Sequence, residues 1–412
     1  MPLPSPLATL AASPIAWRVN ARARRGPYGP RQASVLSHAA FARAKAEITR
    51  WPGYAPTPLL ALPGLAKALG IGALWFKDEG KRFGLKSFKA LGGAYAVLRQ
   101  VQKVIAARTG IADAPSADIA AGKYRHYTKD VTVACATDGN HGRSVAWGAA
   151  TFGCRCVITI HAGVSQGRAD AIARYGAEVR RIKGNYDDSV RQAAEDAKAN
   201  GWIIVSDTSW PGYMEIPKDV MQGYALMADE AMAQLGAERP THLFLQAGVG
   251  GMAAAVAAHF WEAMGAARPR VVLCEPDKAA CLFASVAEGR AATIAGDLDT
   301  VMAGLAAGET SPLAWEILED CADAAMTVGD AAAGPAMQLL AAGVGSDPPV
   351  VAGESAVCTL GCLAGAMRDP AIAKALELDA RSTVLLFGSE GDTDPALYET
   401  LVGRPADQVR AA

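Results

Sequence analysis

The segment 136–147, with the sequence ATDGNHGRSVAW, contains residue types that could take part in chemistry. It joins the end of a short apolar run to the start of an amphipathic, helix-like run. At such a strand-to-helix turn the backbone N–H groups point beyond the strand, so the turn is suited to bind an anion. Asp138 nevertheless places a carboxylate there. The segment therefore predicts either that Asp138 caps the following helix or that it meets a positively charged group of a ligand.

A second turn of this kind, AGVGGMA over 247–253, is rich in glycine. Glycines between a strand and a helix let backbone N–H groups approach a phosphate without interference from a Cβ atom. The spacing also satisfies G-x-G-x-x-A, and Glu275 ends the next apolar run, so a dinucleotide site is an alternative. Because glycine is also common at this turn for close packing, the motif alone predicts an anion cradle and nothing finer. Its members are Gly248, Val249, Gly250 and Gly251.

Lys86 and Lys89 lie three residues apart in GLKSFKALGG, at the expected start of a helix. Their neighbours Phe83, Leu85 and Phe88 are apolar. Most lysines on helices are solvated, but a desolvated lysine loses its preference for the charged form and can act as a nucleophile or move a proton. A phosphate cradle together with a desolvated lysine suggests pyridoxal 5'-phosphate (PLP), an aldehyde cofactor held by a lysine Schiff base.

The elements that must position these residues form a regular pattern. From Val131 onward, short apolar runs alternate with longer Ala-rich, amphipathic segments; the runs are VTVACA, CRCVITI, WIIVSD, THLFLQA, RVVLCEP and STVLLFG. Buried strands that alternate with helices make a parallel α/β sheet with helices on either side. Ligands bind beyond the C-terminal ends of such strands, where 137–142, 247–253 and GSEGDTD at 388–394 are expected.

Length and composition limit the class of protein. A chain of 412 residues predicts two domains, and the net charge of -1 gives no reason to expect nucleic acid or an anionic membrane as a partner. No apolar run approaches the ~18 residues of a membrane span. The eight cysteines lack the repeated C-x-x-C spacing of a metal site, so we expect no metal and a reducing cytoplasm.

Residues 1–46 contain several arginines and no acid, as mitochondrial transit peptides do. Four of the six prolines of this segment would break an amphipathic helix near its start: Pro2, Pro4, Pro6 and Pro14. We therefore expect an irregular arm on the surface.

The segments GLKSFKALGG, ATDGNHGRSVAW and AGVGGMAAAV, in this order, resemble the second fold type of PLP enzymes, the tryptophan synthase β and threonine dehydratase group. The segments FKDEGKRFGLKSFKALGG, VSDTSWPGYMEIPKDVMQGY, MAGLAAGE and GSEGDTD narrow the resemblance to the diaminopropionate ammonia-lyases, from about Trp51 to about Pro395. The resemblance implies two domains with twisted parallel sheets flanked by helices. Residues 1–104 and 211–412 would form a large PLP domain, and 105–210 a small domain that closes over substrate. It also implies a homodimer.

The resemblance assigns roles to matching positions. Lys89 would form the Schiff base, Asn140 would contact the ring hydroxyl of the cofactor, and Ser389 would bond the pyridine nitrogen. Lys86 departs from the pattern of the family, and its ammonium group is expected to help lower the pKa of Lys89. The phosphate would be held by Gly248, Val249, Gly250, Gly251 and Met252.

The resemblance also implies a substrate with a second amine. The wider family generally has serine where this chain has Asp138, in a loop that receives the substrate carboxylate and includes Gly139 and His141. Two carboxylates ~4 Å apart repel by about 4 kcal/mol at an effective dielectric of ~20. A helix dipole offsets only ~0.3–1 kcal/mol of this. The β-ammonium of 2,3-diaminopropionate would instead attract Asp138. Asp207, at the end of WIIVSD, would be a second acid in the site unless it caps a helix.

The implied activity is a carbon–nitrogen lyase reaction, a PLP-dependent β-elimination that converts 2,3-diaminopropionate to pyruvate and ammonia through aminoacrylate. Lys89 would remove the α-proton of the L enantiomer, and Asp138 that of the D enantiomer from the opposite face of the cofactor. Two alternatives remain. A serine or threonine dehydratase of the same fold is disfavoured by the carboxylate of Asp138. A nucleotide-dependent oxidoreductase that uses GVGGMA and Glu275 leaves the lysine segment unexplained.

Overall fold

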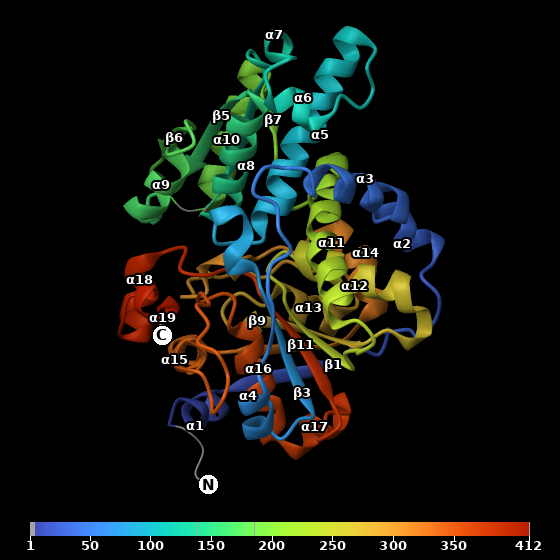
Figure 1. The fold of residues 1–412 in the computed structure, drawn as a ribbon, viewed down its shortest axis with the longest axis vertical. Helices are drawn as coiled ribbons and strands as arrows, with labels where there is room; N and C mark the ends of the chain where they lie inside the picture. Colours follow the sequence, from blue (N-terminus) through green and yellow to red (C-terminus); the bar gives the residue numbers. More distant parts are fainter. Residues whose placement is uncertain (1–4, 138, 185, 412) are drawn as a thin grey trace. The chain divides into compact units, whose positions relative to one another are not determined.

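The computed structural model describes residues 5–137, 139–184 and 186–411. These residues form two compact units, each with its own β-sheet (Figure 1). Unit 1 consists of Met1–Ser37, Pro56–Lys86 and Met227–Ala412. Unit 2 consists of His38–Ala55 and Ser87–Leu226.

The sheet of unit 1 has seven strands in the order β1-β10-β9-β8-β11-β3-β2. In that order the bounds are Ile15–Val19, Ala322–Val328, Arg270–Pro276, His242–Gln246, Thr383–Gly388, Ala73–Asp78 and Leu59–Ala61. The five inner strands run parallel, and β1 and β2 pair antiparallel at the two edges. Strands β8, β9 and β11 are buried almost throughout, as their continuous apolar runs predicted.

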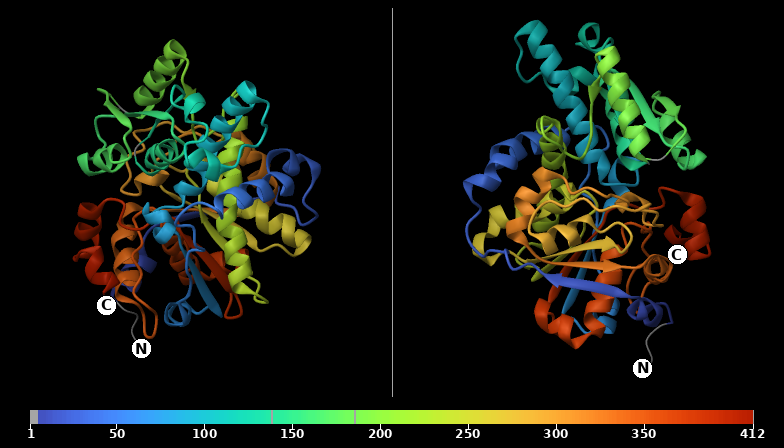
Figure 2. Two further views of the ribbon diagram at one scale, coloured as in Figure 1. Left: turned by 45° about the horizontal axis from the view of Figure 1, so that its top comes forward. Right: turned by 180° about the vertical axis from the view of Figure 1, so that it is seen from behind.

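Helices cover both faces of this sheet (Figure 2). Helix α12 contacts β8, α13 contacts β9 and β10, and α16 contacts all three strands. The helices of unit 1 are α1 (Ser5–Ala12), α2 (Pro30–Val35), α4 (Pro63–Leu69), α12 (Gly251–Met264), α13 (Cys281–Glu288), α14 (Pro312–Cys321), α15 (Ala333–Ala342), α16 (Cys358–Arg368), α17 (Pro370–Leu376), α18 (Pro395–Val402) and α19 (Ala406–Arg410). Short 3-10 turns are η1 (Glu79–Gly84), η2 (Gly265–Ala267), η3 (Ala303–Leu305) and η4 (Asp330–Ala332). The predicted α/β class, with parallel sheets flanked by helices, is confirmed.

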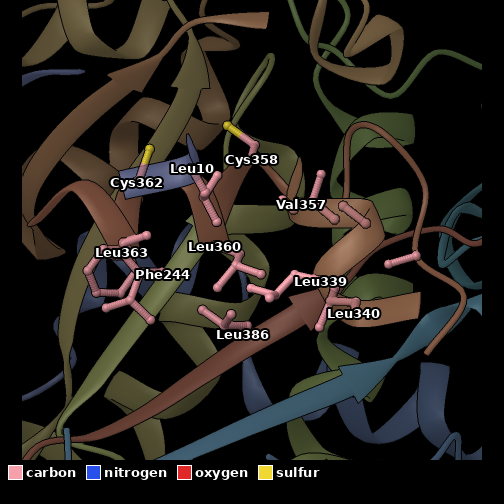
Figure 3. Close-up of a cluster of buried hydrophobic side chains, with 14 of the residues drawn as sticks. Leu10, Phe244, Leu339, Leu340, Val357, Cys358, Leu360, Cys362, Leu363 and Leu386 are labelled. Carbon is pink, nitrogen blue, oxygen red and sulfur yellow. The ribbon is translucent and has the colours of Figure 1, made fainter. Parts of the chain in front are cut away.

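A large apolar core of unit 1 includes side chains from α1, α15, α16 and the sheet (Figure 3). Leu7 and Leu10 of α1 belong to it, with 1% and 0% of their surface exposed. The expectation of an irregular surface arm is therefore wrong for this segment. Pro6 is compatible with the helix because it lies in the first turn, where the missing N–H would have no partner within the helix.

The sheet of unit 2 has four parallel strands in the order β6-β5-β4-β7. In that order the bounds are Glu178–Arg181, Arg155–Ile160, Thr132–Ala136 and Ile203–Ile204. The helices are α3 (His38–Ile48), α5 (Lys89–Thr109), α6 (Ser116–Ala120), α7 (Arg125–Thr128), α8 (Asn140–Phe152), α9 (Gln166–Ala173), α10 (Tyr186–Asn200) and α11 (Glu215–Leu235), whose last residues belong to unit 1. All six predicted apolar runs contain a strand of one of the two sheets.

Glycines bring α5 against α8 and α11 within unit 2. A Cβ atom on Gly93 of α5 would lie 1.9 Å from Oγ of Ser144 on α8. One on Gly92 would lie 2.3 Å from the ring of Tyr224 on α11. These contacts leave no room for a side chain, so they fix how the start of α5, where Lys89 lies, packs against α8.

The compact units differ from the domain boundaries that we expected. Residues 87–104 and 211–226 belong to unit 2 together with 105–210, because α5 packs on α8 and the first part of α11 packs on α5. Lys89 therefore lies in unit 2, whereas the glycine loop 247–253 lies in unit 1. The division into a large PLP domain and a small closing domain stays a prediction. No described helix combines the length and apolar character of a membrane span.

Candidate active site

Lys89 and Asp207 form an ion pair in unit 2. Nζ of Lys89, the first residue of α5, donates a hydrogen bond to Oδ2 of Asp207. The two side chains are only 18% and 16% exposed. The rings of Phe88 and Tyr224 lie with their centroids 5.3 and 5.8 Å from Nζ. Lys89 thus has the apolar surroundings that its neighbours in the sequence suggested, and its ammonium is offset by one carboxylate.

Asp207 also faces His141 of α8. Nε2 of His141 donates to the carbonyl oxygen of Val205 at 2.8 Å, because a carbonyl oxygen can only accept. Nδ1 lies 3.8 Å from Oδ2 of Asp207. Burial alone would raise the pKa of Asp207, but the electrostatic effects of the nearby His141 and Lys89, with the hydrogen bond from Lys89, outweigh it and hold that pKa well below its usual range. Asp207 is therefore ionised at neutral pH. Since α11 begins only at Glu215, Asp207 does not cap a helix.

Two hydroxyl groups fix the backbone around this pair. Oγ of Ser144, on α8, donates to the carbonyl oxygen of Lys89 at 2.7 Å. Oγ1 of Thr137 accepts from the N–H groups of Gly139 and Gly142 at 3.0 and 3.1 Å, which holds the turn before α8. Sequence reasoning missed both hydroxyls, because nothing local to either residue shows which backbone atom it will meet.

The rest of the segment 137–142 is described in part. Asn140 begins α8, and its Oδ1 accepts from Arg143 at 3.0 Å. Gly139, with φ and ψ angles of 164° and -91°, precedes the helix as its N-cap residue. Asp138 lies outside the described residues, so both of its predicted roles, helix cap and charged partner of a ligand, stay predictions.

The glycine loop of unit 1 directs its carbonyl groups to the protein. The carbonyl of Gly248 accepts from Sγ of Cys281 at 3.3 Å, and that of Val249 accepts from the N–H of Ser311 at 3.0 Å. Gly248 and Gly250 have φ angles of +55° and +98°, and a Cβ on Gly250 would lie 2.9 Å from Cβ of Ala314. Glycine is therefore required there.

Among the N–H groups of this loop, that of Gly250 donates to the carbonyl of Ala247 at 2.9 Å, and the others have no acceptor in the part of the chain that the structure describes. No described residue accepts a hydrogen bond from the N–H of Gly248, Val249, Gly251 or Met252, the last two being the first residues of α12. Three of these residues are buried: Gly248, Gly251 and Met252. Buried donors need an acceptor, and several converging at a helix N-terminus fit a phosphate. The residues present therefore fit the phosphate of PLP.

Ser389 follows β11, the strand beside β8, and is 5% exposed. The backbone of its loop is tied to Lys86, because the N–H of Gly391 donates to the carbonyl of Lys86 at 2.9 Å. Nζ of Lys86 lies 2.6 Å from Oδ2 of Asp392, which Arg410 also contacts. Asp392 thus balances the charge of Lys86, and the expected effect of Lys86 on the pKa of Lys89 stays a prediction.

Glu275, which the dinucleotide alternative assigned to a ribose, is fully buried at the end of β9. Both of its carboxylate oxygens accept backbone N–H groups, from Leu282 at 3.1 Å and Phe283 at 2.7 Å. Glu275 is therefore not available to bind a ribose, and the dinucleotide alternative lacks the acid that it requires. Among the described residues, no cluster of His, Cys, Asp and Glu is arranged to hold a metal ion.

Comparison with known proteins places this geometry in context. The family model described as "Pyridoxal-phosphate dependent enzyme" matches residues 50–387. The diaminopropionate ammonia-lyase of Escherichia coli (strain K12) is 40% identical over 88% of this chain and 92% of its own. The solved structure of diaminopropionate ammonia lyase from Escherichia coli in complex with D-serine matches with a TM-score of 0.86 at 37% identity, covering 95% of this chain and 97% of that one. The same Escherichia coli enzyme in complex with an aminoacrylate-PLP azomethine reaction intermediate matches with a TM-score of 0.83 at 37% identity, with the same coverage.

Proposed function

Because the chain belongs to the pyridoxal-phosphate-dependent enzymes and, within them, to the diaminopropionate ammonia-lyase family, we propose that it converts 2,3-diaminopropionate to pyruvate and ammonia by β-elimination. Family membership confirms the predicted resemblance and PLP as the cofactor. The observation in this chain that best supports the proposed substrate is Asp207, a largely buried, ionised carboxylate bonded to an ammonium group. A carboxylate held in this state can equally accept the β-ammonium of a diamino acid.

The proposed roles of the cofactor-binding residues follow from their chemistry. When bound, PLP supplies the electron sink that stabilises negative charge at the substrate α-carbon. Lys89 binds the cofactor aldehyde, Asn140 contacts the ring hydroxyl, and Ser389 accepts or donates a hydrogen bond at the pyridine nitrogen. The free N–H groups of the loop Gly248–Met252 hold the phosphate.

The proton steps use Lys89 and Asp207. The neutral amine of Lys89 takes the α-proton of the L enantiomer and becomes an ammonium. The ammonium then bonds Asp207, which is the arrangement seen in the structure. The β-ammonium leaves as neutral ammonia with the electron pair of the C–N bond, so the leaving group needs no additional acid. The hydrogen bond from Ser144 keeps the backbone of Lys89 in place through both steps.

Asp138, with Gly139 and His141, is proposed to line the substrate site. There Asp138 attracts the β-ammonium and takes the α-proton of the D enantiomer. Assays of pyruvate and ammonia release from each enantiomer test the proposal directly. The Asp138→Asn variant should lose turnover of the D enantiomer more than of the L enantiomer. An unchanged rate on the D enantiomer would exclude Asp138 as that base.

A serine or threonine dehydratase activity is the second candidate, because the solved structure of the Escherichia coli enzyme binds D-serine. A comparison of kcat/KM for 2,3-diaminopropionate and for serine, with each enantiomer, decides between the two. We expect the diamino acid to be favoured, since serine brings no cation to Asp207. Equal or higher kcat/KM on serine would overturn the proposed substrate.

We also propose a cytoplasmic homodimer. The family resemblance supports the dimer, and the eight cysteines, all free thiols in the structure, suit a reducing compartment. Light scattering on the purified holoenzyme measures the mass in solution. A monomer at micromolar concentration would contradict the proposed state.

A further inference from the structure

The glycine loop rests on the start of α13. Sγ of Cys281, the first residue of this helix, donates to the carbonyl of Gly248. A Cβ on Gly250 would lie 3.1 Å from Cδ1 of Leu282, the next residue. Cys281 and Leu282 are both fully buried. The position of the loop therefore depends on where α13 begins.

Glu275 fixes that beginning. It accepts the N–H groups of Leu282 and Phe283, which as the second and third residues of α13 have no partner within the helix. No side chain of the preceding N-cap residue, Ala280, meets them. A carboxyl group from the neighbouring strand β9 thus replaces the usual capping side chain.

The environment of Glu275 indicates that its structural role is to accept these two hydrogen bonds from α13. Its side chain is fully buried, and burial raises its pKa to about 8. A carboxyl group removed from water at this cost is retained where its hydrogen bonds matter. The bonds lead to the start of α13, where Cys281 lies. Its single S–H donates to the Gly248 carbonyl, and its Sγ is 3.8 Å from Oε1 of Glu275.

We propose that Glu275 and Cys281 are positioning residues for the cofactor phosphate: Glu275 holds the start of α13, and Cys281 holds the Gly248 carbonyl so that the loop N–H groups converge on the phosphate. Neither residue touches the cofactor. The inference depends on the proposed assignment of the loop to the phosphate and adds the residues that set its geometry. It also gives a role to the acid that the dinucleotide alternative had claimed.

Binding of PLP to the apo-protein tests the proposal, with pyridoxal, which lacks the phosphate, as the second ligand. Cys281→Ala removes the donor and should weaken PLP binding roughly threefold, whereas Cys281→Ser keeps a donor and should stay closer to wild type. Pyridoxal binding should be unchanged in both variants. The 31P chemical shift of bound PLP should move in Cys281→Ala. Cys156→Ala, which removes a buried thiol from unit 2, is the matched control.

Glu275→Gln gives a second test. Its amide N–H₂ would meet one of two backbone donors, so PLP binding should weaken roughly tenfold, and the amides of Leu282 and Phe283 should exchange hydrogen faster. Glu288→Gln, at the other end of α13, should change neither the PLP affinity nor the hydrogen exchange of these amides.

The outcomes distinguish the positioning role of Cys281 from the assignment of the glycine loop to the phosphate. Equal loss of PLP and pyridoxal affinity in Cys281→Ala, or an unchanged dissociation constant and 31P shift, would overturn the positioning role. Wild-type protein that binds pyridoxal as tightly as PLP would instead overturn the assignment of the loop to the phosphate.

Discussion

Replacing Asp207 with asparagine should destabilise unit 2 of the apo-protein. Removing one partner of a buried ion pair costs about 3–5 kcal/mol, because the other charge stays buried. Lys89 and Asp207 keep 18% and 16% of their side-chain surface exposed, and the asparagine oxygen can still accept from Lys89, which together reduce the cost. We expect a loss of about 2–3 kcal/mol at pH 7.

The pH dependence has a definite sign. The pKa of Asp207 is lower in the folded than in the unfolded chain, so the stabilisation is fully present above the unfolded value of about 4 and is lost as the pH falls below it. The difference between wild type and Asp207→Asn should therefore be constant from pH 6 to 7 and shrink in acid.

Asp219 on α11 of the same unit is the matched control. Burial raises the pKa of Asp219. The charges of Lys103 and Arg99, whose nitrogens lie 3.9 and 3.8 Å from its carboxylate, compensate for this effect only in part. A carboxyl with a raised pKa loses stabilisation as the pH rises, so Asp219→Asn should leave stability unchanged or increase it at pH 7.

Native-state hydrogen exchange of amides in α5 and α8 measures the opening free energy of unit 2 without requiring two-state unfolding of the whole chain. Equal opening free energies for wild type and Asp207→Asn at pH 7 would refute the electrostatic account of this pair. An equal loss of opening free energy in Asp207→Asn and Asp219→Asn would refute it as well.

Three further changes should have measurable effects. Gly93→Ala places a Cβ 1.9 Å from Oγ of Ser144 and should cost roughly 1–3 kcal/mol in the opening of α5, measured by hydrogen exchange. Arg82→Met leaves the buried carboxylates of Glu79 and Glu230 without the cation that both of them bond. The free energy of unfolding in urea should fall by about 3–5 kcal/mol, and a fall near zero would contradict this account of the three buried charges. Because the pKa of Glu275 is raised to about 8, wild type should lose stability as the pH rises from about 5 to 8, and Glu275→Gln should remove this slope in thermal unfolding.

The sequence is most informative where local pattern and burial coincide. Strands β8, β9 and β11 are buried on both faces, so they appear as continuous apolar runs, and the positions of the loops after them follow from the amino-acid sequence alone. Lys89 can be singled out for the same reason, because its apolar neighbour in sequence, Phe88, also lies beside its Nζ in space.

The edges of the sheets give much weaker signals. Strand β6 reads EVRR and β1 is largely exposed, so neither has the apolar run of an inner strand. The N-terminal segment differs from its expectation because only two side chains of α1, Leu7 and Leu10, are needed to anchor it in the core. Composition over 46 residues cannot show two such contacts.

Contacts between distant segments account for the parts of the site that the sequence does not predict. Ser144 meets Lys89, and His141 faces Asp207, only because α8 packs against α5 and bonds Val205, the residue after β7. The glycines that allow this packing, Gly92 and Gly93, read in the sequence as a weakness of the helix. Their purpose becomes clear only from the Ser144 and Tyr224 atoms that occupy the space of the missing Cβ.

We expect the charges of the site to favour a diamino acid over serine. Asp207 stays ionised at neutral pH because the nearby His141 and Lys89 hold its pKa well below the usual range. When Lys89 acts as a base its amine is neutral, so the carboxylate then lacks the charge of its closest cation while remaining largely buried. A substrate with a β-ammonium supplies such a charge, and a hydroxyl group offers only a neutral hydrogen bond, which is roughly half as strong. The preference for the diamino acid therefore follows from Asp207 even before any contribution of Asp138 is added.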